Sequence, residues 1–274
     1  MTLVSVIIAT YNEDQYLKKC LESLACQKKA RFEIIVVDDG SFKKAKNLEL
    51  KSKNGTFRFF RIKHSGTAVA RNFGAKKAKG DILVFVDGDM EFEPDFLEQL
   101  IEPIEQGLAK GTISTEEYVA NWNNVWARCW NFEQGLKTRK RIDEKDMMLR
   151  DFRAILKSEF DRVGGFSNTG YTDTWSLSEK LGYKPVKTKA KYYHYNPASM
   201  QEVFWQALWI GGRQRKFGIV GKIVAGLRAT MPVSIFLGLV KAITYKEMGM
   251  LNFKIIYDLG ILSGIMSGAS RKAV

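Results

Sequence analysis

The chain has 274 residues, of which 45% are hydrophobic and 12% aromatic, and this content excludes a disordered chain. Its length suits one large α/β domain, or a domain with an appendage. Its net charge of +13 comes without a nucleic-acid recognition motif or an aromatic platform among the basic residues, which argues against a nucleic-acid-binding protein.

An apolar run begins within the first few residues, without a basic leader or a cleavage site. We therefore expect no secretory signal and a protein on the inside of a cell. The three cysteines, Cys20, Cys26 and Cys129, have no paired spacing. Reduced thiols in the core are expected, in place of disulfides or a zinc site.

Three apolar runs, 4–10, 33–38 and 82–87, have the length and spacing of parallel strands with helices between them. A shorter run at 57–62 predicts a further strand, and residues 67–79 predict the helix that leads into the last strand. The pattern indicates βαβ units with right-handed crossovers. Such units bind ligands beyond the carboxyl ends of their strands.

Acidic clusters follow three of these strands, at residues 10–13 (TYNE), 38–41 (DDGS) and 87–89 (DGD). Each cluster alone fits a turn. Three of them at carboxyl ends favour a ligand site instead. The sequence has neither G-x-G-x-x-G nor G-x-x-x-x-G-K-[ST], so neither a dinucleotide-binding fold nor a P-loop is supported.

Asp87 and Asp89 end the most apolar of these strands, with Gly88 between them. Charge at the end of a buried strand is costly unless a cation compensates it. Two carboxylates suit Mg²⁺ or Mn²⁺ carrying a diphosphate, since Mg²⁺ typically takes one or two carboxylates and fills its other positions with phosphate and water. A turn formed by Asp and Gly is the alternative.

The C-terminal stretch, 201–274, is both basic and apolar, with ten Lys or Arg against three acidic residues. Two apolar runs within it, 229–239 and 255–268, are interrupted by proline or charged residues. Neither supplies the ~20 uninterrupted apolar residues of a spanning helix. We expect amphipathic helices that lie on an anionic membrane surface. A solvated basic face on ordinary core helices is the alternative.

Four ordered motifs resemble those of the family 2 glycosyltransferases, enzymes that use nucleotide-diphosphate sugars. They are residues 5–13 (SVIIATYNE), 34–41 (IIVVDDGS), 66–72 (GTAVARN) and 87–89 (DGD), and a looser match runs through 163–166 (VGGF) to about residue 200. The resemblance implies an α/β chain of GT-A fold, with a Rossmann-like, mostly parallel central sheet flanked by helices.

The same resemblance implies a domain organisation. We expect a GT-A catalytic domain over residues 1–200, with a nucleotide-sugar-binding half at 1–90 and an acceptor half at 91–200. A helical, membrane-associating extension would follow at 201–274.

The resemblance also implies site residues. The nucleotide sugar would be bound by Thr10, Tyr11, Glu13, Asp39, Gly66, Arg71, Asn72, Asp87 and Gly88. Asp39 would hydrogen-bond the base, commonly uracil in this family, and Arg71 would lie near the pyrophosphate. Asp89 would bind Mn²⁺ or Mg²⁺, and His194 would complete the metal site. A packed core position is the alternative for His194, although imidazole is an acceptable ligand of Mn²⁺ beside carboxylates.

The family's catalytic base lies a few residues after the Gly-Gly-Phe segment, usually as the Asp of a Glu-Asp pair. In the matching stretch, Asp173 is the only acid, with Thr172 in place of the Glu and Trp175 where another acid is frequent. We expect Asp173 to take the proton of the acceptor hydroxyl. A surface Asp or a helix N-cap is the alternative.

The expected function is an inverting, metal-dependent glycosyltransferase for glycan or glycolipid assembly. The donor would be a nucleotide-diphosphate sugar, UDP favoured over GDP. The acceptor would be a hydroxyl or phosphate, including a lipid-linked one such as a polyprenyl phosphate. The alternative is a catalytically impaired GT-A module that binds a nucleotide sugar or a partner without transfer. The expected location is cytoplasmic, peripheral at the inner face of the cell membrane.

Overall fold

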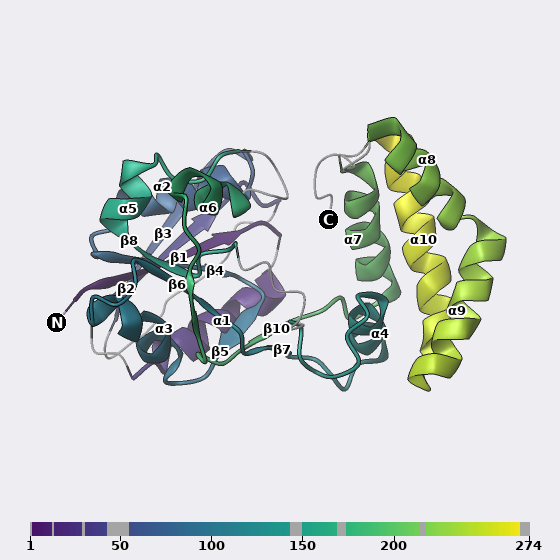
Figure 1. Cartoon of the computed structure of the whole chain (residues 1–274), viewed down its shortest axis with the longest axis horizontal. Coiled ribbons are helices and arrows are strands. Elements are labelled where there is room, and N and C mark those ends of the chain that lie inside the picture. The colour runs from purple at the N-terminus through teal and green to yellow at the C-terminus, as the bar shows by residue number, and fades with distance from the viewer. Residues whose placement is uncertain are drawn as a thin grey trace. The chain divides into compact units, whose positions relative to one another are not determined.

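The computed structural model describes residues 2–12, 14–28, 31–42, 55–142, 150–168, 174–213 and 218–268. The chain forms two compact units (Figure 1). The sheet unit comprises Met1–Tyr118 and Ile142–His194, and the helical unit comprises Val119–Arg141 and Tyr195–Val274. The predicted boundary at residue 200 stays a prediction; the structure groups 119–141 with the C-terminal helices.

A seven-stranded sheet forms the centre of the sheet unit, in the order β3-β2-β1-β4-β8-β6-β9. Its strands are β1 (Val4–Thr10), β2 (Phe32–Asp38), β3 (Gly55–Arg61), β4 (Ile82–Asp87), β6 (Gly111–Ser114), β8 (Ala154–Leu156) and β9 (Val186–Thr188). Strands β3, β2, β1 and β4 are parallel neighbours, whereas β8 runs antiparallel to both β4 and β6. The predicted α/β fold with a mostly parallel sheet is confirmed.

Every residue of β1 and β2 is buried, because helices cover both faces of the sheet (Figure 1). Successive residues of a strand point to opposite faces. Val6 and Ile8 pack in a cluster with α1 (Asp14–Ala25) and α3 (Phe96–Glu105). Ile7 and Ala9 pack in a second cluster with α2 (Thr67–Lys77), α5 (Lys157–Arg162) and α6 (Trp175–Leu181). Two cores therefore fix β1 and the edge where it ends.

A smaller sheet of three strands has the order β5-β10-β7, with β5 at Met90–Phe92, β7 at Glu117–Val119 and β10 at Tyr192–His194. Strand β10 pairs antiparallel with β5 in a register that sets His194 opposite Met90. Since β5 begins directly after Asp89, this pairing brings His194 to the Asp-Gly-Asp motif.

The helical unit contains α4 (Val125–Glu133), α7 (Met200–Gly212), α8 (Gly218–Arg228), α9 (Met231–Tyr245) and α10 (Gly249–Ser267). Helix α10 contacts all four of the others. Its closest approach is to α7, where a Cβ added at Gly264 would lie 2.0 Å from the carbonyl oxygen of Leu208. Only glycine permits this backbone contact, as in closely packed membrane helices.

Two charged side chains of α10 are buried in the helical unit. Lys254 Nζ lies 2.8 Å from Asp258 Oδ1 and 3.0 Å from Glu133 Oε1 of α4. The second Asp258 oxygen accepts a hydrogen bond of 2.7 Å from Ser234 Oγ of α9. Paired charges therefore join α4, α9 and α10, and the interior of this unit tolerates them because each is compensated.

Among the described residues, α10 is long and apolar enough to cross a membrane, although 39% of its apolar window is buried within the chain. Helices α8 and α9 pass the same test only as a pair, and they are bent by 68° at their junction. Core helices of soluble proteins reach the same length and apolar content, so these two properties do not distinguish a membrane helix from a core helix. The apolar run predicted at 255–268 is shorter than α10, which begins at Gly249 and includes Lys254.

The cysteines follow the prediction only in part. Cys20 and Cys129 are buried, as expected of core thiols, whereas Cys26 is exposed directly after α1. Burial raises the pKa of the Cys129 thiol to about 12, so this thiol stays protonated and unreactive at neutral pH.

Candidate active site

The sheet register places three of the predicted motifs at one edge. Thr10 pairs with Asp38 across β1 and β2, and Ala9 pairs with Asp87 across β1 and β4. The three strands therefore end together, at the carboxyl edge where open α/β sheets bind ligands. Side chains from the turns after these strands can act on one ligand.

Asp39 organises the loop before α2. Its Oδ1 accepts a hydrogen bond of 2.8 Å from the Ser65 amide, and its Oδ2 accepts one of 2.8 Å from the Gly66 amide. Gly66 has φ +102°, a conformation that favours glycine, and it immediately precedes the first residue of α2. Asp39 thus fixes this helix end; its contact with a base stays a prediction.

An aromatic pair lies beside this carboxylate. The rings of Tyr11 and His64 are stacked, with centroids 4.3 Å apart and planes 26° apart. His64 Nδ1 lies 3.0 Å from Asp39 Oδ2. Thr10 is buried in the same strand end, and its hydroxyl oxygen has no hydrogen-bond partner among the described residues. The two rings form an aromatic surface, with the Asp39 carboxylate and the Thr10 hydroxyl next to it.

Arg71 of α2 points to the Asp-Gly-Asp motif. Its Nη2 lies 2.5 Å from Asp87 Oδ1, and its guanidinium lies 5.9 Å from the centre of the Phe166 ring. Burial opposes the ionised form of Asp87, but Arg71 and then Arg153 hold the pKa of this carboxyl below its usual range. Asp87 is therefore ionised, and it orients Arg71. Gly88 is buried in the turn that joins β4 to β5.

Asn72 acts on the site indirectly. Its side chain donates a 2.8 Å hydrogen bond to the Phe166 carbonyl and accepts a 3.0 Å bond from the Phe166 amide. This two-point contact fixes the segment that follows Gly-Gly, and with it the ring that lies against Arg71. The predicted role in shaping the pocket remains a prediction.

Asp89 and His194 converge beyond the strand end. His194 Nε2 lies 3.2 Å from Asp89 Oδ2, while His194 Nδ1 lies 2.9 Å from Oε1 of Glu117. All three side chains are mostly buried, with exposed fractions of 13% to 22%. Carboxylate and imidazole are an acceptable donor pair for Mn²⁺.

The donor set fits a metal ion that shares its coordination with a substrate. Within the described residues, no group of three or more His, Cys, Asp and Glu side chains is placed to hold an ion. Asp89 with His194 would supply two ligands, which suits a cation whose remaining positions are filled by phosphate and water.

Behind His194 lies a chain of hydrogen bonds that the sequence did not predict. The Tyr192 hydroxyl donates to Glu117 Oε2 at 2.8 Å, and Arg153 Nη2 donates to the Tyr192 hydroxyl at 3.1 Å. Arg153 Nη1 also donates to the Phe85 carbonyl of β4, at 3.2 Å. Burial raises the pKa of Tyr192, so its hydroxyl stays protonated and able to donate.

Two of the predicted site residues, Glu13 and Asp173, lie outside the described residues. Their roles remain predictions. The remaining predicted residues all belong to the sheet unit, on or beside the ends of β1, β2, β4 and β10 and the start of α2.

Comparison with solved structures shows the same fold. S. aureus TarS 1–349 in complex with UDP-GlcNAc has a TM-score of 0.57 at 16% identity, over 96% of this chain and 90% of that chain. The mannosyltransferase PcManGT from Pyrobaculum calidifontis, in complex with GDP-Man and Mn²⁺, has a TM-score of 0.55 at 17% identity, over 94% and 86% of the two chains.

Relatives by sequence are more similar to the chain, over shorter stretches. EpsH of Bacillus subtilis (strain 168) is 35% identical over 100 residues, which are 36% of this chain and 29% of EpsH. The glycosyltransferase GlyA of Streptococcus pneumoniae serotype 4 is 33% identical over 103 residues, 37% of this chain and 15% of GlyA. The match spans less than a third of the length of these relatives.

The family model described as Glycosyl transferase family 2 matches residues 5–167, more than half of the chain. This range contains all four motifs on which the predicted resemblance rests, and the predicted family is confirmed. The chain belongs to glycosyl transferase family 2.

Proposed function

We propose that this chain moves a sugar from a nucleotide-diphosphate donor to a hydroxyl or phosphate acceptor, in glycan or glycolipid assembly. One observation carries the proposal: the Arg71–Asp87 and Asp89–His194 pairs lie at the same sheet edge as the Asp39 loop. A nucleotide diphosphate is bound by a cation and a metal ion at its phosphates and by an aromatic ring at its base. This edge of the sheet carries residues for each of these contacts.

The donor is a UDP-sugar in preference to a GDP-sugar. Tyr11 and His64 offer a stacked face for a base, and Asp39 lies beside it to accept a ring N–H. The preference for uracil rests on the family position of Asp39. TarS has been solved with UDP-GlcNAc and with UDP, whereas PcManGT has been solved with GDP-Man.

Asp89 and His194 hold Mn²⁺ or Mg²⁺ in this proposal. The PcManGT structure contains Mn²⁺, and the donor set described above fits such an ion. A bound divalent cation supplies electrostatic stabilisation of the charge that develops on the diphosphate. Arg71 would assist through its Nε, which is buried and donates no hydrogen bond within the described part of the chain. A phosphate oxygen would satisfy it.

Transfer proceeds with inversion. The acceptor oxygen attacks the anomeric carbon, the bond from that carbon to the diphosphate oxygen breaks, and the leaving diphosphate takes the electron pair. Asp173 accepts the proton of the acceptor. A single displacement with one base inverts the anomeric configuration. Support for Asp173 comes from its place in the sequence after the Gly-Gly-Phe segment.

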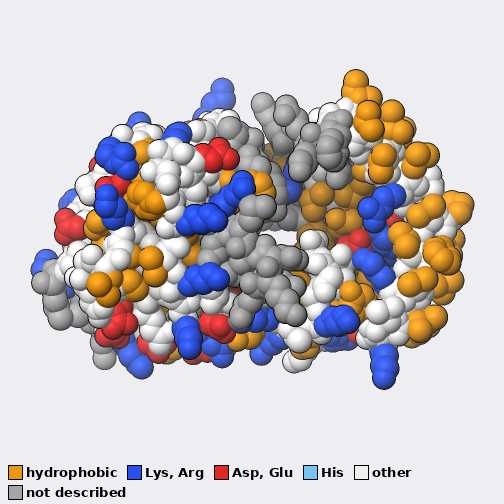
Figure 2. Space-filling model, viewed as in Figure 1, with side chains coloured by type: hydrophobic (Ala, Val, Ile, Leu, Met, Phe, Trp, Pro, Cys, Tyr) orange, Lys and Arg blue, Asp and Glu red, His pale blue; other side chains and the backbone are white. Residues whose placement is uncertain are grey.

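The helical unit binds the surface of an anionic membrane, at the inner face of the cell membrane. No residue of α8 is buried, and large apolar side chains of α8 and α9 are exposed (Figure 2). Lys222 and Arg228 lie on α8 among them. Apolar side chains with interspersed cations suit an interface with anionic head groups. A membrane location would give access to a lipid-linked acceptor such as a polyprenyl phosphate.

A second candidate function is binding of a nucleotide sugar or a partner without transfer. The altered stretch around Asp173, with Thr172 and Trp175 in place of the usual acids, favours it. Donor hydrolysis and transfer should be measured on one sample with a panel of UDP- and GDP-sugars. We expect turnover by the wild type, and loss of transfer with intact nucleotide binding in Asp173→Asn. Binding without any turnover would support the second candidate.

A further inference from the structure

We propose that Glu117 is a positioning residue that fixes the ring and the tautomer of His194, so that Nε2 of His194 faces the divalent cation shared with Asp89. The inference rests on the proposed metal-dependent function, and it adds a residue that lies outside every motif of the family resemblance.

The two nitrogens of His194 face different carboxylates. Nδ1 lies 2.9 Å from Glu117 Oε1, and Nε2 lies 3.2 Å from Asp89 Oδ2. A neutral imidazole donates through one nitrogen and binds a metal through the lone pair of the other. An ionised carboxylate only accepts, so Glu117 and Asp89 each favour a proton on the nitrogen that faces it. A divalent cation bound by Asp89 would displace the proton from Nε2, and the proton that remains lies on Nδ1, where Glu117 Oε1 accepts it. Nε2, on the Asp89 side, is left with its lone pair for the ion.

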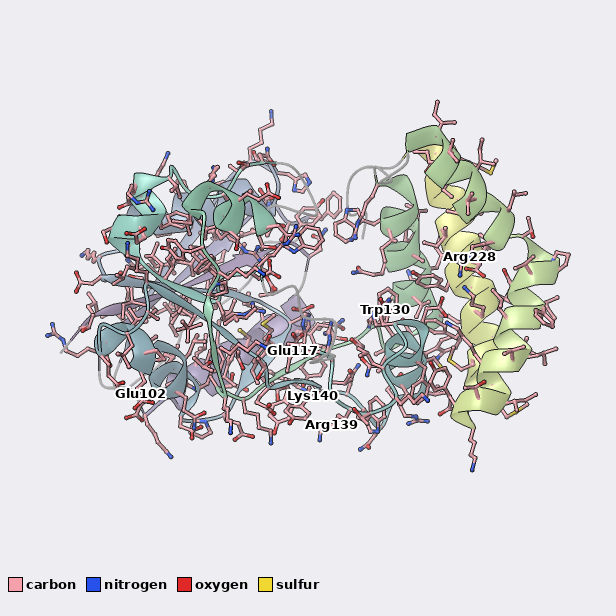
Figure 3. All side chains as sticks on the ribbon, viewed as in Figure 1. Glu102, Glu117, Trp130, Arg139, Lys140 and Arg228 are labelled. Carbon is pink, nitrogen blue, oxygen red and sulfur yellow. The ribbon has the colours of Figure 1, made fainter. Side chains whose placement is uncertain are left out.

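Glu117 is itself fixed from behind. Strand β7 carries it in the small sheet, beside β10 with His194, and Figure 3 labels its side chain. Oε2 accepts from the Tyr192 hydroxyl at 2.8 Å, so that Oε1 remains for His194. Arg153 donates to Tyr192 and to the Phe85 carbonyl of β4. The chain of contacts thus starts on the strand that carries Asp87 and returns to His194.

This arrangement matches a general feature of metal sites. Histidine ligands usually donate their second ring N–H to a carboxylate or carbonyl, and loss of that partner typically weakens metal binding by about 10- to 100-fold. The structure shows the partner in place, with the histidine on one strand and the carboxylate on its neighbour.

The test measures Mn²⁺ affinity of the full chain by electron paramagnetic resonance of unbound Mn²⁺, in the presence of UDP. Glu117→Ala, which removes the acceptor of the Nδ1 proton, should weaken Mn²⁺ binding by about 10- to 100-fold. Tyr192→Phe, which keeps the ring and removes only the hydroxyl, should give a smaller loss in the same direction. Glu116→Ala is the matched control, because Glu116 accepts from the Tyr118 hydroxyl instead. It should bind Mn²⁺ like the wild type.

Melting temperatures without metal establish that each variant folds. If Glu117→Ala does not fold, Tyr192→Phe keeps the test decisive. Unchanged Mn²⁺ affinity in both variants, with a large loss in His194→Ala, would overturn the role of Glu117 and leave the metal site intact. Unchanged affinity in His194→Ala and Asp89→Asn would overturn the proposed metal site itself. A loss in Glu117→Ala as large as in Asp89→Asn would make Glu117 a direct ligand, which also contradicts the proposal.

Discussion

At the scale of single residues, Arg71 is the best example of a side chain whose setting explains its chemistry. A cation on an amphipathic helix would ordinarily face water, yet Arg71 is buried beside Asp87 and the Phe166 ring. Burial is affordable only because the carboxylate compensates the charge. The pair therefore holds a guanidinium in a fixed direction at the ligand edge of the sheet.

Replacing Arg71 by alanine should reduce turnover of a UDP-sugar by about 100- to 1000-fold, because a fixed donor to the developing charge is lost. Lys76→Ala is the control, since Lys76 is exposed on the same helix. Steady-state kinetics on both variants, with melting temperatures to verify folding, provide the measurement. Turnover within about twofold of wild type in Arg71→Ala would contradict the role of Arg71 at the phosphates.

The residues of the site differ in how visible they are in the sequence. Asp87 and Asp89 stand out because they end an apolar strand, and Arg71 stands out through the Gly-Thr-Ala-Val-Ala-Arg-Asn motif. Glu117 and Arg153 lie on or next to short strands in separate parts of the chain, without a motif around them. Only the pairing of β10 with β7 brings Glu117 beside His194, and Arg153 reaches this pair only through its hydrogen bond to Tyr192.

At the scale of elements, one buried carboxylate joins the strands at their amino ends, opposite the ends that carry the candidate site. Glu33 near the start of β2 accepts a hydrogen bond of 2.6 Å from each of three groups: the Ser5 hydroxyl, the Lys79 amide and Arg58 Nη2. These donors come from β1, from the segment before β4 and from β3. Burial raises the pKa of Glu33, but the three donors outweigh it and hold the pKa below its usual range.

A lowered pKa in the folded chain makes this stabilisation depend on pH. It is complete above the ordinary pKa of about 4.5, and it is lost as the pH falls through the lower pKa of the folded state. Glu33→Gln should lower the free energy of unfolding by about 1.5–3 kcal/mol at pH 7, and the gap to wild type should narrow below pH ~4.5. Urea unfolding between pH 3 and 7 provides the measurement.

The control for this experiment is Glu102→Gln, an exposed position on α3 labelled in Figure 3. A surface substitution of this kind should change the free energy of unfolding by less than about 0.5 kcal/mol at any pH. If Glu33→Gln behaves like Glu102→Gln, the carboxylate does not hold the strands together.

The elements themselves were largely predictable, and the grouping of one segment was not. The bounds of β1 and β4 agree with the predicted runs, because fully buried strands consist of uninterrupted apolar residues. The segment 119–141 belongs to the helical unit through contacts such as Arg128 with Glu247, 2.7 Å apart, and Glu133 with Lys254. Partners more than 100 residues apart leave no periodic signal in the sequence.

At the scale of the whole molecule, the two units differ in how many large apolar side chains they expose. Among the described residues, the helical unit carries most of the large hydrophobic side chains that are exposed to solvent, with Ile223, Phe236 and Ile243 among them. Contiguous apolar surface of this kind marks an interaction site in soluble proteins and membrane-bound proteins alike. The neighbouring cations favour an anionic membrane.

The double variant Ile223→Asp with Phe236→Asp should lose binding to vesicles of phosphatidylcholine and phosphatidylglycerol. These side chains are 57% and 65% exposed, so the fold should tolerate the change. The loss of two apolar contacts, about 1.5 kcal/mol or more each, predicts at least about 100-fold weaker partitioning in co-sedimentation.

Leu108→Asp is the control for this substitution, because Leu108 is 75% exposed but belongs to the sheet unit. It should bind vesicles like the wild type. Failure of the wild type to bind anionic vesicles, or equal binding by the double variant, would remove the membrane from the proposed function.

The central claim is that one edge of the sheet binds a nucleotide diphosphate together with a divalent cation. The most direct measurement is the melting temperature of the full chain with UDP, with and without Mn²⁺, in the wild type and in Asp89→Asn. Ligand binding to the folded state raises the melting temperature. We predict a rise in the wild type only when UDP and Mn²⁺ are both present, and no rise in Asp89→Asn. A rise of equal size without Mn²⁺, or an unchanged rise in Asp89→Asn, would contradict the claim.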